Sequence, residues 1–471
     1  MNIGASFSDA PILMLEKTAI MQRDSIDFSN GKVSHLFRKL FIPTLFGSLS
    51  ICAVTAIDGI FVGQGAGSDG VAAVNIVVPI WILFSGLELM VGSGCSVVAA
   101  LHLSKGNENA ARLNVAQALL FTLAVTVAGC SLILLIPETV ARMLGASDSL
   151  MPQVLDYMLY ITPCFLFQVW STIGLFIIRL DGAPKVAMWC NVANAVTNAV
   201  LDWVFIFPLG MGVKGAAIAT DISVVVGGVI AMAYLLFFAK RLKPKLPKWS
   251  RKSCVLSLRN IAYQCRIGFS SLLGEIMLAV LVFVGNVVFM QYLGDDGVGA
   301  FGIVCYYTPF IFTLGNSIVQ SVQPIVSYSY GNGAYDRVRK ARSLMMKVSV
   351  LLGLGVTLVF VLFPEMLVAL FIDTSCKAGM LAVKGMPLFA SGFVFFVINV
   401  CVVGYYQSVE RIVPSTTVML LRGVVLLLPC FLFLPQLIGE DGIWLATPLA
   451  ELVTTMMIVM YMLCKKIWRT R

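Results

Sequence analysis

Runs of twenty or more apolar residues recur along the whole of this 471-residue chain. A helix of about 20 apolar residues spans the roughly 30 Å hydrocarbon core of a bilayer and satisfies its own backbone hydrogen bonds there. Only 12% of the residues are charged, against about 25% in an ordinary soluble domain. The sequence therefore predicts an all-α membrane protein with twelve transmembrane helices, at residues 41–63, 71–103, 115–136, 154–178, 186–208, 215–239, 267–293, 298–328, 344–364, 385–408, 413–436 and 442–464.

The loops between these spans alternate in charge. One set includes nine basic residues at 240–266 and five at 337–347. The opposite set has four in all, namely Arg142, Lys214, Lys377 and Lys384. Because basic loops remain on the cytoplasmic side of a membrane, we expect a multi-pass protein of the cell membrane with both termini in the cytoplasm.

The rest of the composition argues against several other classes of protein. The net charge of +9 comes from short loops, so no nucleic-acid partner is expected. The twelve cysteines form no CxxC pair, and His35 and His102 are too far apart for a histidine-based metal site, so we expect no cofactor. No DDxxD, HExxH or GxSxG motif is present, which argues against an enzyme. Residues 1–40 have no cleavable apolar core and are expected to form a cytoplasmic or surface-lying amphipathic segment.

The two halves of the chain resemble each other at a shift of about 227 residues. Residues 67–74 (GSDGVAAV) match 294–301 (GDDGVGAF), and residues 215–220 (GAAIAT) match 442–447 (GIWLAT). Two shorter matches lie between them: Gly106 and Arg112 with Gly331 and Arg337, and Pro137-Glu138 with Pro364-Glu365. Each half contains six predicted spans, so both copies have the same orientation in the membrane.

A duplication of this kind is typical of transporters, in which two lobes rock about a central cleft. A duplicated bundle without a transport role is the alternative. The predicted organisation is an N-terminal segment (1–40), a first lobe (41–240), a cytoplasmic linker (241–266), a second lobe (267–464) and a basic cytoplasmic tail (465–471).

Four polar residues of the first half are predicted to lie in the outer part of the membrane. Asp58 lies about 17 residues, or roughly 26 Å, into an outward-running span, and Asp202 lies equally far into another. Asn198 is one turn before Asp202 on the same helical face, and Thr220 lies near the start of an inward-running span. A carboxylate in hydrocarbon marks a functional site by default. These oxygens could form a cage for Na⁺, or two carboxylates could share one proton; the alternative is that each carboxylate is satisfied locally.

Glu88 and Glu275 form a second pair, predicted in the inner half of the membrane with one residue in each lobe. They could face the central cleft and attract a cationic substrate, or they could be hydrogen-bonded struts between helices. The second half lacks counterparts of the first-half acids, because Asp58 aligns with Gly285 and Glu88 with Gly315. Pro43 breaks the hydrogen-bond ladder of the first span, so a bend is expected there, either as a hinge or as a fixed kink.

Several strings of the first half make the chain resemble the multidrug and toxic compound extrusion (MATE) family over its whole length. They are residues 56–63 (AIDGIFVG), 182–185 (GAPK), 198–207 (NAVLDWVFIF) and 212–220 (GVKGAAIAT). The second half begins with residues 268–275 (GFSSLLGE), similar to the prokaryotic branch of MepA-like transporters.

The resemblance implies two six-helix lobes in a bacterial inner membrane, and export of organic cations driven by inward Na⁺ or H⁺. It also implies a cation site formed by Asp58, Asn198, Asp202 and Thr220, and it links Pro43 with bending of the first helix. Glu88 departs from the family pattern, and Glu275 lies about a turn before the acid of the Na⁺-coupled NorM-type branch. A monomer in the lipid bilayer is expected.

The nearest rival function is a flippase for lipid-linked oligosaccharide. Such a carrier is expected to line its cleft with Arg and Lys for a pyrophosphate. Arg179 and Arg422 are the main candidates within or at the edge of spans, which is too few to favour this function.

Overall fold

The computed structural model describes residues 26–246 and 250–469, which form helices and no strand. The predicted N-terminal segment lies mostly outside the described residues, and α2 begins at Val33. The helices in chain order are α2 (Val33–Ser104), α3 (Glu108–Leu135), α4 (Pro137–Met143), α5 (Met151–Ile161), α6 (Cys164–Asp181), α7 (Pro184–Ile206), α8 (Gly212–Ala233), the π-helix η1 (Tyr234–Phe238), α9 (Arg251–Gly331), α10 (Tyr335–Leu362), α11 (Pro364–Ala369), α12 (Lys377–Ala390), α13 (Phe393–Ser408), α14 (Ile412–Leu420), the π-helix η2 (Leu421–Val425), α15 (Leu427–Ile438) and α16 (Glu440–Arg469).

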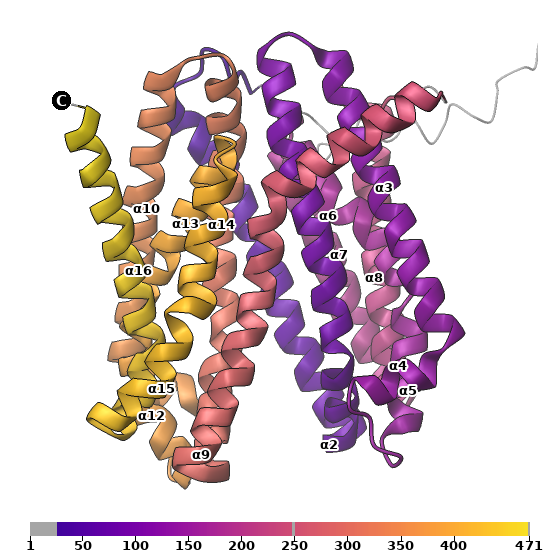
Figure 1. The fold of residues 1–471 in the computed structure, drawn as a ribbon. Helices are drawn as coiled ribbons and strands as arrows, with labels where there is room; N and C mark the ends of the chain where they lie inside the picture. The colour runs from indigo at the N-terminus through magenta and orange to yellow at the C-terminus, as the bar shows by residue number, and fades with distance from the viewer. Residues whose placement is uncertain (1–25, 247–249, 470–471) are drawn as a thin grey trace, which may run out of the picture. The chain divides into compact units, whose positions relative to one another are not determined.

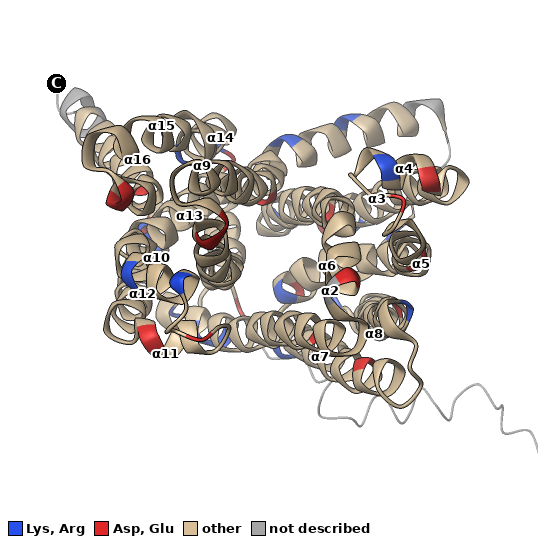
Figure 2. Cartoon of the chain, turned by 90° about the horizontal axis from the view of Figure 1, so that it is seen from below, with Lys and Arg blue, Asp and Glu red and all other residues tan. Residues whose placement is uncertain are grey.

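Contacts divide the chain into two compact units. Unit 1 comprises the residues up to Phe84 and Val98–Ile261, and unit 2 comprises Ser85–Val97 and the residues from Ala262 onward. In unit 1, α6 and α7 lie beside α8, whereas in unit 2 α13 lies beside α10, α14 and α16 (Figure 1). The ribbon is predominantly tan when seen along the helices, with few acidic or basic residues (Figure 2). The stretch Ser85–Val97 belongs to unit 2, although it lies in the first half of the sequence.

Glycines with positive φ angles occur at corresponding positions of the two halves. Gly67 (φ 69°) and Gly294 (φ 65°) interrupt α2 and α9, so each of these long helices consists of two limbs. Two further pairs, Gly106 with Gly333 and Gly212 with Gly439, end or begin helices. Only glycine adopts these angles without strain. The backbone therefore repeats the duplication, and the partner of Gly106 is Gly333 rather than the expected Gly331.

Nine helices in the described part of the chain are long and apolar enough to cross a membrane, or ten if α12 and α13 are one bent span. One of the nine is the segment Ser253–Gly331, whose two limbs meet at Gly294. If α9 is counted as two limbs and α12 with α13 as one bent span, these segments make eleven. The 23-residue helix α7 is the twelfth, so all twelve predicted spans are accounted for. The prediction of a twelve-helix, two-lobed membrane fold is confirmed.

The fourth predicted span, at 154–178, consists of two helices rather than one. Helix α5 ends at Ile161 and α6 begins at Cys164, with Pro163 between them. The corresponding span of the second half is likewise broken between α12 and α13, by a bend of 47°. Because Ser391 and Gly392 occupy that second break, the interruption belongs to the repeated fold and does not require a proline.

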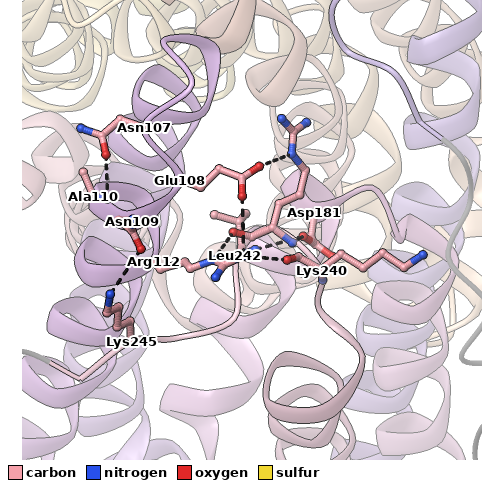
Figure 3. A network of polar contacts seen from close by, with 10 residues as sticks. Asn107, Glu108, Asn109, Ala110, Arg112, Asp181, Lys240, Leu242 and Lys245 are labelled. Carbon is pink, nitrogen blue, oxygen red and sulfur yellow. Dashed lines mark hydrogen bonds and ion pairs between the residues drawn. The ribbon is translucent and has the colours of Figure 1, made fainter.

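A polar network attaches the chain after η1 to the ends of α3 and α6 (Figure 3). The buried carboxylate of Asp181 accepts hydrogen bonds from the Tyr234 hydroxyl at 2.9 Å and from the backbone N–H groups of Arg241 at 3.0 Å and Leu242 at 3.2 Å. The guanidinium of Arg112 donates to the backbone carbonyls of Lys240 and Arg241 at 2.9 and 3.0 Å. The beginning of the predicted linker is therefore held against unit 1.

Candidate functional site

The four first-half residues singled out by depth lie on three helices of unit 1. Asp58 is on the first limb of α2, Asn198 and Asp202 are one turn apart on α7, and Thr220 is on α8. Asn198 and Asp202 are buried, with exposed fractions of 5% and 0%. The Asn198 side-chain amide donates a hydrogen bond to the Thr220 hydroxyl at 3.2 Å. Close packing of α7 against α8 thus aligns the amide and the hydroxyl.

The carboxyl groups of Asp58 and Asp202 lie within hydrogen-bonding reach of each other. Within the described part of the chain, Oδ1 of Asp58 and both carboxyl oxygens of Asp202 have no hydrogen-bond donor. Asp202 is fully buried and Asp58 is half-buried. Two neighbouring carboxylates in such a site are energetically costly, because burial removes hydration and their charges repel. A proton or another cation between the two carboxylates would remove this cost.

Tyr157 is a further member of this group that the sequence did not indicate. It lies on α5, is 9% exposed, and interacts electrostatically with both Asp58 and Asp202. Asp221, the neighbour of Thr220, has no such interaction with either acid. Adjacent helical residues point about 100° apart, so Asp221 and Thr220 face different surroundings.

The donor set of this site suits a hard cation. The Asn198 amide N–H₂ is directed to Thr220, so the amide oxygen remains available as an acceptor. With the two carboxylates and the Thr220 hydroxyl, it makes a set of oxygen ligands of the kind that hard cations prefer. No cluster of three or more His, Cys, Asp or Glu residues that could hold a metal ion is found in the described ranges.

Glu88 and Glu275 both belong to unit 2, whereas the sequence placed one in each lobe. That prediction is wrong because Ser85–Val97 has its contacts with the second half of the chain. Glu88 is fully buried. The side chain of Glu275 lies against Gly86, where a Cβ atom would be 3.7 Å from the Cβ of Glu275. The role of these residues in a substrate cleft stays a prediction.

Pro43 is buried inside the first limb of α2. Gly67 is the only residue in the whole of α2 with non-helical backbone angles. The helix therefore continues through Pro43 in this structure, and the hinge role of Pro43 stays a prediction.

The two arginines that sequence analysis considered for a pyrophosphate are both buried. The Arg422 guanidinium binds the Glu451 carboxylate through two nitrogens, with Nη2 at 2.6 Å and Nε at 3.0 Å from Oε1, and lies 4.1 Å from the Phe396 ring centroid. Its charge is thus compensated. Arg179 lies 5.9 Å from the centre of the Phe176 ring.

Twelve spans in two repeated halves, with uncompensated carboxylates buried in the first half, define a duplicated membrane transporter. The chain belongs to the MatE family, whose model matches residues 43–204 and 271–432. The model matches once in each half of the chain, which also confirms the duplication. The predicted resemblance to MATE transporters of the MepA type is confirmed.

Two curated relatives each cover at least 90% of the chain. A FAD transporter of Shewanella oneidensis is 23% identical over 94% of this chain and 97% of its own length. The multidrug export protein MepA of Staphylococcus saprophyticus is 22% identical over 90% and 92%. Among solved structures, an outward-facing multidrug resistance MATE family transporter of the MOP superfamily has a TM-score of 0.85 at 20% identity, covering 93% of this chain and 96% of that one. A MOP superfamily transporter of Pyrococcus furiosus has a TM-score of 0.83 at 21% identity, with the same coverage.

Proposed function

We propose that this chain is a cation-coupled antiporter, using Na⁺ or H⁺, that exports organic cations across the bacterial inner membrane. The observation that carries the proposal is the pair formed by half-buried Asp58 and buried Asp202, which meet from separate helices without a hydrogen-bond donor to most of their oxygens. A site of this kind binds a cation more tightly in whichever conformation brings the two carboxylates together. Differential affinity for two states is all that coupling requires.

In the proposed cycle, the coupling ion binds between Asp58 and Asp202 from outside, where inward gradients maintain its concentration. Neutralisation of the two carboxylates then favours repacking of the first lobe, with Pro43 as a hinge, and drug release to the outside. Glu88 and Glu275 are proposed to attract the positive charge of the substrate. The basic loops and both termini are placed in the cytoplasm by the positive-inside rule.

The test is transport in proteoliposomes that contain the purified chain, with Na⁺ and pH gradients imposed separately and a fluorescent organic cation as cargo. One of the two gradients is expected to drive uptake by inside-out transporters. Asp58→Asn and Asp202→Asn keep the size of each side chain but remove its charge. Each substitution is expected to reduce gradient-driven transport to the level of protein-free vesicles, with the yield and thermal unfolding of the protein unchanged.

Asp295→Asn is the matched control, because Asp295 is an exposed aspartate immediately after the break at Gly294. Its transport is expected to equal that of the unmodified chain. Full gradient-driven transport in both the Asp58→Asn and the Asp202→Asn variants would refute the proposed coupling site.

An anionic cargo is the second candidate, because one relative of the chain is a FAD transporter. The arginine chemistry gives this cargo little support, since Arg422 is already neutralised by Glu451. The same consideration applies to the flippase alternative and its pyrophosphate. Including FAD as a second cargo in the proteoliposome assay separates the two candidates. An exporter of organic cations is expected not to transport FAD across the vesicle membrane.

A further inference from the structure

Contacts within unit 2 gather the basic residues of three helices at one end. The Tyr263 hydroxyl of α9 donates to Oε1 of Glu410 at 2.7 Å, in the turn between α13 and α14. The Arg342 guanidinium of α10 lies 5.6 Å from the centre of the Tyr405 ring of α13. These contacts bring the beginning of α10 and the unit 2 part of α9 to the α13–α14 turn. The basic residues at this end are Arg266, Arg337, Arg339, Lys340, Arg342 and Arg411.

A groove of about 430 Å³ opens at this end of unit 2, between α9 and α14. Its apolar walls are formed by Met90, Phe269, Ile412 and Val413. Phe269 is 41% exposed and Val413 is 74% exposed. Helix α9 and the segment that begins with α14 are both apolar enough to cross a membrane. The groove therefore offers space to a hydrocarbon chain.

The charged residue that lines the groove is Arg266. Arg266 is exposed at the groove and has neither a hydrogen bond nor an ion pair with any residue in the described ranges. Its electrostatic neighbour is Tyr263, whose hydroxyl is already directed to Glu410. Thr416 and Thr417 add two hydroxyl groups to the lining. Among the described residues, no carboxylate lines the groove. An anionic group would therefore complement the positive charge of Arg266 at this end of the groove.

We propose that this groove is a binding site for an anionic phospholipid of the leaflet at the basic end of unit 2. The Arg266 guanidinium and the hydroxyls of Thr416 and Thr417 bind the phosphate, and one acyl chain lies along Met90 and Phe269. Planar guanidinium groups bind phosphate through paired hydrogen bonds, and basic pockets between transmembrane helices bind anionic headgroups. A cationic substrate is repelled by Arg266, which distinguishes this groove from the proposed transport site.

The test is native mass spectrometry of the full chain in a neutral detergent, titrated with phosphatidylglycerol or with phosphatidylcholine of the same acyl chains. The unmodified chain is expected to bind one phosphatidylglycerol at least tenfold more tightly than phosphatidylcholine. Arg266→Gln is expected to lower the affinity for phosphatidylglycerol by roughly tenfold, in line with the loss of hydrogen bonds from a charged donor. Arg266→Lys keeps the charge and is expected to retain most of the preference.

Two further variants separate the site from a general effect of surface charge. Arg339→Gln is the matched control, because Arg339 is exposed at the same end, pairs with Asp336 and does not line the groove. It is expected to bind phosphatidylglycerol as the unmodified chain does. Thr417→Trp keeps Arg266 but fills the groove, and it is expected to lose the bound lipid.

Three outcomes would overturn the proposal: equal binding of the two lipids by the unmodified chain, an unchanged preference in both Arg266→Gln and Thr417→Trp, or an equal loss in Arg339→Gln. Lipid binding is measured without transport. A failure of this proposal is therefore distinguishable from a failure of the proposed antiport.

Discussion

At the scale of single residues, the two units deal with buried charge in opposite ways. Asp58 and Asp202 of unit 1 have no basic partner among the described residues, whereas Glu451 of unit 2 is paired with Arg422. Asn399 completes the second arrangement by donating to Oε2 of Glu451 at 2.7 Å. Arg422 thus supplies within unit 2 a positive charge of the kind that the proposed coupling ion would supply in unit 1.

Removing only the cation of the Arg422–Glu451 pair is expected to destabilise the protein strongly. Both side chains are 5% exposed, so Arg422→Met leaves a buried carboxylate without its counter-charge, at a cost of about 3–5 kcal/mol. The double variant Arg422→Met with Glu451→Gln carries no uncompensated charge and is expected to recover most of this loss. Equilibrium unfolding in mixed micelles measures both variants. Equal stability of the single and double variants would contradict the argument.

Depth along a helix could be predicted from the sequence, whereas direction around the helix axis could not. The constant rise per residue of an α-helix predicted that Asp58, Asn198, Asp202 and Thr220 lie at a similar depth. The structure pairs Asn198 with Thr220 and Asp58 with Asp202. Tyr157 was not found, because its electrostatic interaction with the two acids depends on the rotation of α5, which ends at the unpredicted break before α6. The Arg422–Glu451 pair was missed for the same reason, since no periodicity shows which helices face each other.

At the scale of elements, a buried carboxylate fixes the end of the sixth span. Asp181 is 1% exposed and accepts hydrogen bonds from the N–H groups of Arg241 and Leu242 and from the Tyr234 hydroxyl. Asp181→Ala leaves these donors buried without an acceptor, at about 1–3 kcal/mol for each. We expect a loss of several kcal/mol, visible as a lower temperature of thermal unfolding in detergent.

Glu108→Gln is the comparison for Asp181→Ala in the same network. The Glu108 carboxylate pairs with Arg241 at 3.0 Å but remains 39% exposed, and solvent-exposed ion pairs contribute only about 0–1 kcal/mol. A small shift in the unfolding temperature is therefore expected. If both substitutions lowered the unfolding temperature equally, the Glu108–Arg241 ion pair would stabilise this end of unit 1. The Asp181 carboxylate that accepts the backbone N–H groups would then not be its main source of stability.

At the scale of the whole molecule, the units defined by contacts do not coincide with the halves of the sequence. The Ser93 hydroxyl accepts a hydrogen bond from the Gln407 side chain at 2.8 Å, and its backbone carbonyl accepts one from Gln323 at 2.9 Å. Ser93 and its neighbours thus complete unit 2 from the first half of the chain. The sequence repeat predicted the duplication but not this exchange, because a repeat shows which segments are equivalent and not which segments they contact.

This exchange predicts how the protein behaves when the chain is divided. Residues 250–471 expressed alone lack Ser85–Val97, so the buried amide of Gln323 loses its acceptor on Ser93 and Gln407 keeps only Ser271. The fragment is therefore expected to aggregate on extraction. Co-expression with residues 1–246 is expected to restore a complex that copurifies in detergent. Gln407→Leu, which removes one contact with Ser93, is expected to reduce copurification, whereas Asp295→Asn leaves it unchanged. A monodisperse 250–471 fragment would show that unit 2 folds without its segment from the first half.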